Sequence, residues 1–526
     1  MVSETRNRLL KLGFAAVIFL SVFASLVMTM RDAGMGWDEG NDVRMARGAG
    51  AWMDRFFFDG QGALTRDAIE KGWGYEWKQH PAVTRTYYAL LYRVFGGMKA
   101  EPAYRDWFAY RICAALLFAT MAVMVFYTGA KRLGCARAGL VAAVAIVCMP
   151  RMFGHAHFTE TDTMLCAVYF AAAVAFLAGL EKPSGSIAFG VLAGLLPAVK
   201  FTGFFALVPF FLYGVIFERE KILRNAVAAV LIAPAVFVAV QPMYWHQPFS
   251  AFYEYISHFV NPQAQYSIVT HYLGQDYART APWHYPFIMV AVSVPLITLV
   301  PAVVGGAGAI LKSDSRKYIV FFIINALFIL FLFAPGRVAK YDGERLFMIA
   351  FPFIALLAAA GFELVFRRLH PVIGLIGFII YSMLSVSFIM ETRPFYLSYY
   401  NEIVGGIEGA EEKGFEISYW GETFTPELAS ALNEELPGGA RLATIGYFTG
   451  NLNRFQEMGL LRSDINIVIY GQEADFLLLF NRRGVLDRRS RYILDNQKPV
   501  ISIVKDEITF AGLYLLEPGV PLIEKR

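Results

Sequence analysis

The sequence has few charged residues and few cysteines for its length. Charged side chains make up 17% of the 526 residues, hydrophobic ones make up 57%, and the mean hydropathy is +0.47. This composition argues against a soluble globular enzyme and is typical of a protein that crosses a membrane several times. A net charge of only +4 gives no reason to expect nucleic acid as a partner.

The positions of the cysteines argue against a disulfide-stabilised protein and against a CxxC metal site. All four lie in or beside apolar runs, and none falls in the large polar regions: Cys113, Cys135, Cys148 and Cys166. A disulfide framework is therefore not expected, and no CxxC pattern offers a metal site. The sequence also shows no internal repeat and no low-complexity tract.

Eleven apolar runs predict an α-helical polytopic membrane protein. Most have about 17–25 residues, the length that crosses a bilayer as a helix, and a few are shorter. The predicted spans are 9–30, 107–129, 138–150, 163–180, 186–199, 203–217, 225–242, 285–311, 318–334, 346–365 and 371–390.

The basic residues between these spans predict their orientation. If the amino terminus is cytoplasmic, five basic clusters all lie on the inner side: 6–8, 131–137, 219–224, 312–317 and 367–368. The first run has no A-x-A-like cleavage site, so we expect an uncleaved anchor. These features predict a multi-pass protein of the cell (inner) membrane.

Two domains are expected. Residues 1–390 form a transmembrane domain with outer loops at 31–106 and 243–284, and residues 391–526 form a small extracytoplasmic α/β domain. Both outer loops are rich in Trp, Tyr and Phe, which suit the headgroup zone, so we expect short helices along the outer surface. In the tail, candidate strands such as RLATIGY and DFLLLF alternate with helix-like segments, and Thr425 before a proline has the position of a helix cap.

An acidic pair, Asp38 and Glu39, follows the first span in the stretch GMGWDEGNDV. Carboxylates are costly at a membrane boundary unless they have a task. The pair either caps a helix at the interface or lies solvated in a loop. Alternatively, it provides a base that acts on a lipid-carried substrate. Glycines at 34, 36 and 40 are expected to let the backbone turn sharply there.

A second acidic group lies in RMFGHAHFTETDTM, at the outer end of the third and fourth spans. Glu160 and Asp162 alternate with threonines, and His155 and His157 precede them. One of these polar residues suits the N-cap of the fourth span. Carboxylate and imidazole groups also bind divalent metals such as Mg²⁺ or Mn²⁺, so the same four side chains are candidate metal ligands.

Several cations break the charge bias by lying on the predicted outer side: Lys200, Arg337, Lys340 and Arg345. They either anchor the protein to lipid headgroups or hold an anionic phosphate at the membrane surface. In the first outer loop, His80 opens the amphipathic segment HPAVTRTYYALLYRVFGG. This segment either packs at the interface or forms one wall of a groove for a lipid chain.

These groups suit the transfer of a sugar from a polyprenyl phosphate. The leaving group is then an anion that needs cations but little protonation, and the acceptor hydroxyl needs a base. One carboxylate and a cationic phosphate clamp are sufficient for this reaction. A glycosidase would instead pair an acid and a base across the bond.

The order of the motifs resembles the GT-C superfamily of membrane glycosyltransferases. Within it, the chain is most similar to glycosyltransferase family 39, the protein O-mannosyltransferase-like group, with the lipid A aminoarabinose transferases as cousins. The resemblance is carried by the DE pair, the HP-x-x-x-x-x-YY segment, FTETDT, KFTG and ERLFMIAFPFIALLAAAG. A carboxyl-terminal outer domain, in place of an inserted β-trefoil-like domain, is similar to prokaryotic members.

The resemblance implies an inverting hexosyl- or pentosyltransferase that uses a lipid-phosphate sugar donor outside the cytoplasm. By it, Asp38 is the expected catalytic base and Glu39 its partner in orienting substrate. Glu160 and Asp162 match the second acidic motif. Lys200 and Arg345 match cations near the lipid phosphate. The expected binding residues for substrate and lipid phosphate are Glu160, Asp162, Lys200, Arg345, His80, Arg337 and Lys340.

The sequence leaves several alternatives open. The sugar can be mannose, arabinose, an aminopentose or another, and the acceptor can be protein, lipid or glycan. A polytopic lipid or glycan transporter or flippase is the alternative function, and a scaffold with a partner-binding outer domain is a third. The absence of a repeat and the position of the acids at the outer edge favour the transferase.

Overall fold

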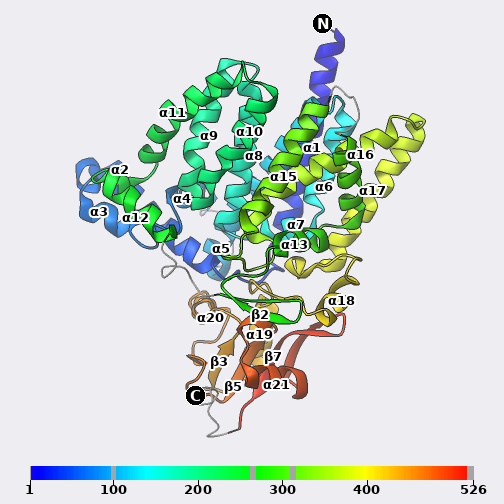
Figure 1. The fold of residues 1–526 in the computed structure, drawn as a ribbon. Helices are drawn as coiled ribbons and strands as arrows, with labels where there is room; N and C mark the ends of the chain where they lie inside the picture. Colours follow the sequence, from blue (N-terminus) through cyan, green and yellow to red (C-terminus); the bar gives the residue numbers. More distant parts are fainter. Residues whose placement is uncertain (1, 96–101, 261–267, 309–314, 518–526) are drawn as a thin grey trace.

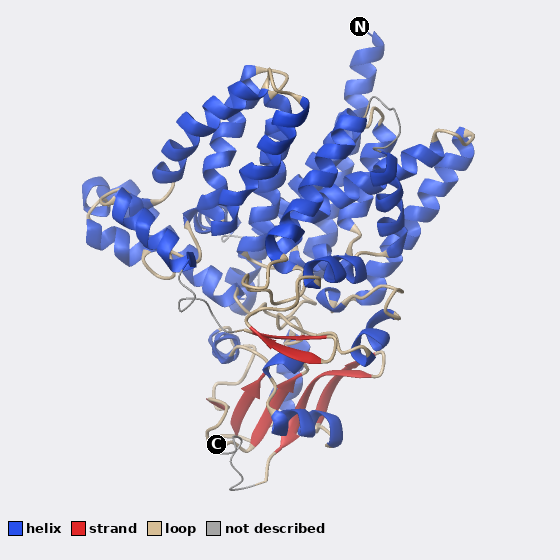
Figure 2. Ribbon diagram, viewed as in Figure 1, coloured by secondary structure: helices blue, strands red, loops and turns tan. Residues whose placement is uncertain are grey.

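A bundle of helices forms one end of the molecule and a small β-sheet forms the other (Figures 1 and 2). The structure, a computed structural model, describes residues 2–95, 102–260, 268–308 and 315–517. The predicted fold class, a helical polytopic membrane protein with a small α/β domain, is confirmed. The end of the predicted span 285–311 and part of the basic cluster 312–317 lie outside the described residues.

Seven helices of the described ranges are long and apolar enough to cross a membrane. They are α1 (Val2–Thr29), α5 (Pro102–Arg132), α8 (Thr161–Gly179), α11 (Ile222–Ala239), α15 (Arg316–Phe333), α16 (Phe351–Phe366) together with the preceding η5 (Arg345–Ala350), and α17 (Pro371–Thr392). An eighth candidate is a pair of helices bent by 120°, α13 (Tyr285–Ser293) and α14 (Leu296–Ala307).

Three predicted spans fall on shorter helices: α6 (Ala136–Val147), α9 (Pro183–Val199), and η1 (Phe201–Ala206) continued by α10 (Leu207–Phe217). At about 1.5 Å per residue, the 12 residues of α6 and the 17 of α9 reach about 18 and 26 Å, less than the apolar core of about 30 Å. Each of the predicted runs corresponds to a helix or a helix pair, but length and composition support seven or eight spans.

Glycines let neighbouring helices of the bundle approach closely. Gly305 on α14 and Gly361 on α16 leave room for the facing backbone, because a Cβ on them would lie 1.9 Å from the Leu357 carbonyl oxygen and 2.0 Å from the Pro301 carbonyl oxygen. In membrane bundles small residues take this role, since packing between backbones drives association there. The contact fixes α16, and with it η5, against α14.

The loops between spans form short helices and one hairpin beside the bundle. They comprise α2 (Glu39–Ala63), α3 (Arg66–Trp73), α4 (Ala82–Phe95), α7 (Pro150–His155), η2 (Pro242–Tyr244), α12 (Pro248–Val260), β1 (Val269–Tyr272) and β2 (Gln275–Ala278). Figure 1 shows α2, α3 and α12 together at one side of the bundle. The expected short helices of the outer loops are thus present, while residues 96–101 and 261–267 lie outside the described ranges.

The tail forms a five-stranded mixed sheet with strand order β4-β3-β5-β7-β6. Its strands are β3 (Arg441–Ile445), β4 (Asn466–Val468), β5 (Phe476–Phe480), β6 (Ile501–Lys505) and β7 (Ile508–Leu515). Around them lie η6 (Tyr396–Ser398), α18 (Gly406–Glu412), α19 (Pro426–Glu435), α20 (Thr449–Glu457), η7 (Arg483–Val485) and α21 (Arg488–Asn496). The central strand β5 is buried along its whole length, as its continuous apolar sequence predicts. Thr425 caps α19 as expected, because its side chain accepts from the Leu428 N–H.

Candidate active site

The acidic pair lies where the loop after α1 meets α2. Asp38 is the N-cap residue of α2 and Glu39 is its first residue. Successive helical positions point about 100° apart, so the two carboxylates face different surroundings. The Asp38 side chain is 31% exposed, whereas the Glu39 side chain is 0% exposed.

Glu39 and Arg111 form what we call the closed cluster. Arg111 donates from two nitrogens to the two Glu39 carboxylate oxygens, each at 2.8 Å. Glu39 also accepts from the backbone N–H groups of Gly36 and Thr159, each at 3.2 Å. Arg111 in turn donates to three carbonyl oxygens of the loop before α2: Met30, Ala33 and Gly34. These contacts fit a residue that fixes the loop, rather than one that touches the substrate.

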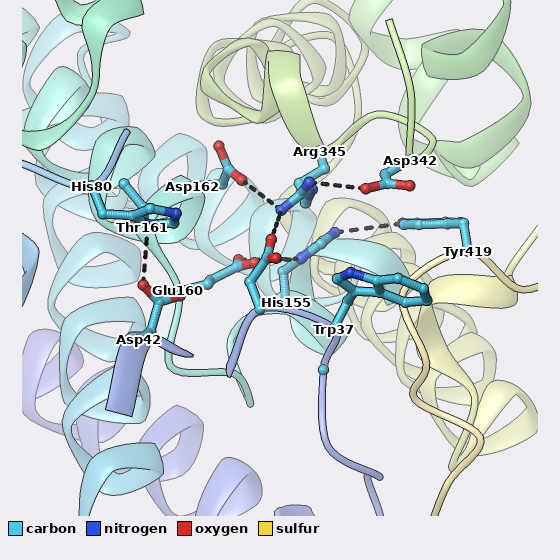
Figure 3. Close-up of polar contacts among 12 residues, drawn as sticks. Trp37, Asp42, His80, His155, Glu160, Thr161, Asp162, Asp342, Arg345 and Tyr419 are labelled. Atoms are coloured by element: carbon cyan, nitrogen blue, oxygen red, sulfur yellow. Dashed lines mark hydrogen bonds and ion pairs between the residues drawn. The ribbon is translucent and has the colours of Figure 1, made fainter. Parts of the chain in front are cut away.

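Asp38 belongs to a second group, the open network, which consists of Asp38, Asp162, Lys200, Asp342 and Arg345. The Arg345 guanidinium lies at its centre, 2.9 Å from both Asp38 and Asp342 and 3.4 Å from Asp162. Lys200 forms an ion pair with Asp162. Figure 3 shows Arg345 between Asp162 and Asp342. The structure thus brings together four of the predicted site residues, although Asp38 and Arg345 are 307 positions apart.

Helix ends supply the charges of the open network. Asp162 lies in the first turn of α8, where the helix dipole favours a carboxylate. Lys200 is the C-cap of α9, where the dipole favours a cation. The two ends meet, so local helix electrostatics and the ion pair favour the same arrangement. Arg345 is the first residue of η5, which leads into α16.

A buried ion pair fixes the backbone beside Arg345. The adjacent Glu344 lies 2.5 Å from Arg151 and accepts from the Tyr419 hydroxyl at 3.1 Å. Glu344 and Arg151 are each 1% exposed. Sequence reasoning missed these residues and also Arg111. The available signal was an ionisable side chain inside or at the end of an apolar run, which needs a partner when it is buried.

His80 forms a dyad with Asp42 beside the open network. Its Nδ1 lies 3.2 Å from Asp42 Oδ1 and 3.3 Å from Thr161 Oγ1 (Figure 3). Burial raises the pKa of Asp42 to about 6. Burial opposes the charged form of His80, but the charge of Asp42 and its hydrogen bond raise the pKa of His80 above its ordinary value. Asp42 was not predicted as a site residue, although it follows Asp38 by four positions on a helix.

The four candidate metal ligands do not gather at one point. Glu160 lies 3.1 Å from Nδ1 of His155, whereas His157 contacts the Phe153 carbonyl oxygen at 2.8 Å. Asp162 points to the cations of the open network. In the described part of the chain, no group of three or more Cys, His, Asp or Glu side chains is placed to hold a metal ion. The residues present therefore do not fit the metal site considered from the sequence.

Two of the predicted phosphate-binding cations lie apart from the open network. Lys340 is buried, and its Nζ donates to the carbonyl oxygens of Pro335 and Val338 at 2.8 and 3.1 Å. Arg337 is exposed at the surface. Lys340 therefore fixes the loop before η5 from the inside.

The carboxyl-terminal domain binds the loop before α2. The Trp37 N–H donates to the Trp420 carbonyl at 2.8 Å, and the Gly34 N–H donates to the Glu422 carbonyl at 3.0 Å. Neither Gly34 nor Gly36 has a positive φ, so the turn expected there does not need the conformational freedom of glycine at these two positions. A Cβ at Gly36 would lie 2.6 Å from the Trp420 ring. These glycines instead let the second domain approach the loop.

Comparisons with known proteins bear on the fold of the chain. Residues 80–246 match the family model described as Dolichyl-phosphate-mannose-protein mannosyltransferase. The crystal structure of ArnT from Cupriavidus metallidurans bound to undecaprenyl phosphate is similar, with a TM-score of 0.50, 14% identity, and coverage of 95% of this chain and 97% of that chain. The apo state of the same protein gives a TM-score of 0.50, 13% identity, and coverage of 97% and 98%. No curated protein matches the sequence.

These similarities confirm the resemblance that the motifs indicated. The structural match extends over nearly the whole chain and shows a shared fold. The family model includes His80, Glu160, Asp162 and Lys200, whereas the two partners Asp38 and Arg345 lie outside it. The open network therefore joins residues of the matched segment to residues on both sides of it.

Proposed function

We propose that this chain, a membrane glycosyltransferase with a domain of the protein mannosyltransferase type, transfers a sugar from a polyprenyl phosphate to an acceptor hydroxyl. The transfer proceeds with inversion, and Asp38 is the base. The observation that carries the proposal is the contact of Arg345 with both Asp38 and Asp162, at 2.9 and 3.4 Å. It puts a cation suited to a phosphate beside the most exposed carboxylate of the open network.

The type of sugar donor is supported by the shared fold. One of the similar structures is that of ArnT bound to undecaprenyl phosphate. In this chain, Lys200 and Arg345 are the cations of the open network, and both come from helix ends of the bundle. We therefore assign the lipid phosphate to these two side chains.

The extracytoplasmic side is supported by the charge pattern together with the architecture. The carboxyl-terminal sheet lies at one end of the bundle and the amino terminus lies at the opposite end (Figure 1). The open network is on the side of the sheet, because Asp342 contacts Arg482, which follows β5. The basic clusters favour a cytoplasmic amino terminus. The reaction is then placed where a flipped lipid-linked sugar meets an outer acceptor.

In the proposed step, the acceptor hydroxyl gives its proton to Asp38 while its oxygen attacks the anomeric carbon. The attack comes from the face opposite the phosphate, which inverts the configuration. The new C–O bond forms as the bond between the anomeric carbon and the phosphate oxygen breaks. The polyprenyl phosphate leaves with the electron pair, and Lys200 and Arg345 stabilise its charge.

Binding of the sugar donor and release of the base are coupled, because both involve the Arg345 guanidinium. Arg345 contacts three carboxylates, and its Nε has no hydrogen-bond partner in the described part of the chain. An arriving phosphate competes with Asp38 for this guanidinium. Once the phosphate takes it, the Asp38 carboxylate is released from this ion pair and can face the acceptor hydroxyl. His80, with a side chain 19% exposed next to Asp42, is placed to bind a sugar hydroxyl.

The test is transfer by the Asp38→Asn variant of the full chain. Membranes receive undecaprenyl-phosphate-linked radiolabelled mannose, arabinose or aminoarabinose separately, and label is counted in protein, lipid and glycan fractions. We expect the wild type to transfer at least one sugar and the variant to be slower by about 10²–10⁴-fold, the range of general-base catalysis. Its apparent melting temperature should stay unchanged.

The matched control is Asp54→Asn, an acid on the same helix with a side chain 60% exposed. It should transfer at the wild-type rate. Full activity of Asp38→Asn would overturn the assignment of the base. Absence of transfer from every lipid-linked sugar by the wild type would overturn the proposed class of sugar donor.

A further inference from the structure

An arginine of the carboxyl-terminal domain reaches the open network. Arg482 follows β5, and its guanidinium lies 2.6 Å from Asp342. The same guanidinium lies 4.6 Å from the centre of the Trp37 ring, next to Asp38 in the chain. Arg482 is buried, at 4% exposure. A buried cation is costly unless it is paired, so this contact between domains is a built feature of the site.

Asp342 is shared between two arginines. Its Oδ1 pairs with Arg482 and its Oδ2 pairs with Arg345, at 2.6 and 2.9 Å. Its backbone has a φ of 55°, in the left-handed region that Asp tolerates better than most residues. The following Gly343 also has a positive φ, of 62°. This bend presents the carboxylate to one arginine from each domain.

With Arg482 included, the charges balance. The carboxylates of Asp38, Asp162 and Asp342 face the cations Lys200, Arg345 and Arg482. Without Arg482, Asp342 would have Arg345 as its remaining ion-pair partner in the described ranges. Asp342 would then draw Arg345 more strongly, at the expense of Asp38 and of an incoming phosphate.

We propose that Arg482 is a positioning residue of the glycosyltransferase site. By taking one oxygen of Asp342, it leaves Arg345 available to Asp38 and to the phosphate of the sugar donor. Its contact with the Trp37 ring adds a second restraint beside Asp38. The carboxyl-terminal domain is thus part of the active site. This inference rests on the proposed function, because it assigns the phosphate to Arg345.

The test is a double-mutant cycle on the binding of undecaprenyl phosphate to the purified full chain. Arg482→Met should weaken binding by about tenfold, the loss of roughly one charge-assisted hydrogen bond. Asp342→Asn should not weaken binding, because the Asp342 carboxylate then no longer competes with the phosphate for Arg345. The double variant should bind like Asp342→Asn, because Arg482 acts through Asp342. Arg482→Lys should keep most of the affinity.

The control is Arg441→Met, which removes a partly exposed arginine of the same domain that pairs with Asp475 at 2.7 Å. It should leave binding unchanged. The inference is overturned if Arg482→Met binds like the wild type, or if its defect is equally large in the Asp342→Asn background. Melting temperatures of the four proteins are measured beside the binding, and binding is compared at a temperature at which all four are folded, which separates positioning from general destabilisation. If the wild type itself fails to bind the lipid, the proposed class of sugar donor is overturned first.

Discussion

The closed cluster and the open network are built around neighbouring residues of the same charge. In the closed cluster, Arg111 makes a two-point contact with Glu39, and both side chains are at most 1% exposed. In the open network, Arg345 is divided among three carboxylates, and Asp38 is 31% exposed. One arginine has every nitrogen occupied, while the other has an unpartnered Nε within the described residues.

The difference shows how two adjacent carboxylates serve two purposes: Glu39 stabilises the fold and Asp38 remains available to a ligand. A buried pair whose hydrogen bonds are all satisfied fixes the backbone around it, and removing one partner leaves an uncompensated charge. A cation shared among several carboxylates can exchange one of them for a ligand. We therefore expect variants of the closed cluster to lose stability. Variants of Asp38, Lys200 or Arg345 in the open network should lose binding or transfer while the fold is kept.

The largest loss of stability is expected from Arg111→Met. It leaves the Glu39 carboxylate buried without a cation, which costs about 3–5 kcal/mol when one partner of a buried pair is removed. The apparent melting temperature in detergent should fall sharply. Adding Glu39→Gln should recover part of the loss. An unchanged melting temperature of Arg111→Met would contradict the distinction between the two regions.

Gly36→Ala should have the next largest effect, because it pushes the two domains apart at the loop before α2. The new Cβ would lie 2.6 Å from the Trp420 ring, and overpacking of this kind costs about 1–3 kcal/mol. Both melting temperature and transfer should fall. Gly13→Ala is the control, since no atom lies within 4 Å of its Cβ position. Equal behaviour of the two variants would argue against contact between the domains at Gly36.

Lys200→Met and Lys340→Met sharpen the comparison, because both lysines were predicted to bind phosphate. Lys200→Met should weaken the binding of undecaprenyl phosphate by about tenfold, since it removes one charged contact. Lys340→Met should keep the binding but lower the melting temperature, because it removes the donor to Pro335 and Val338. Binding isotherms and melting curves of the two purified variants show which lysine binds the lipid phosphate and which one stabilises the fold. The reverse pattern would exclude Lys200 from the phosphate site.

The smallest effect is expected from Glu422→Gln, a change in pH dependence. Burial raises the pKa of Glu422 to about 7, so the folded protein holds a proton that the unfolded chain releases. This stabilisation is fully present below the ordinary pKa of 4.5 and is lost as the pH rises through about 7. The variant should show a smaller fall in melting temperature between these pH values. Glu427→Gln, which alters an exposed acid, should match the wild type.

Much of the site could be predicted from the sequence, because its residues stand out against apolar surroundings. Asp38, Asp162, Lys200 and Arg345 were all recognised as charges at one predicted membrane edge, and they meet in the structure. Spacing could not tell Lys200 from Lys340, since both are cations beside a predicted span. Only the fold shows that one of them donates to backbone carbonyls.

Other residues were beyond sequence reasoning for a physical reason. Arg482 lies in a polar tail where an arginine needs no explanation, and its partner Asp342 is 140 positions away. The glycines before Asp38 were interpreted as turn residues, because a sequence does not show which distant surface approaches them. Ion pairs and close contacts over such separations depend on how the domains pack.

The sequence by itself determined the apolar helices, the sheet of the tail, and the gathering of acids and cations at one edge. Hydrophobic period and helix-end charge are local properties, so they can be read along the chain. The tertiary structure alone decided which carboxylate is closed and which is open. Burial and the number of available donors depend on what packs against a side chain, and that packing comes here from α5, η5 and the carboxyl-terminal domain.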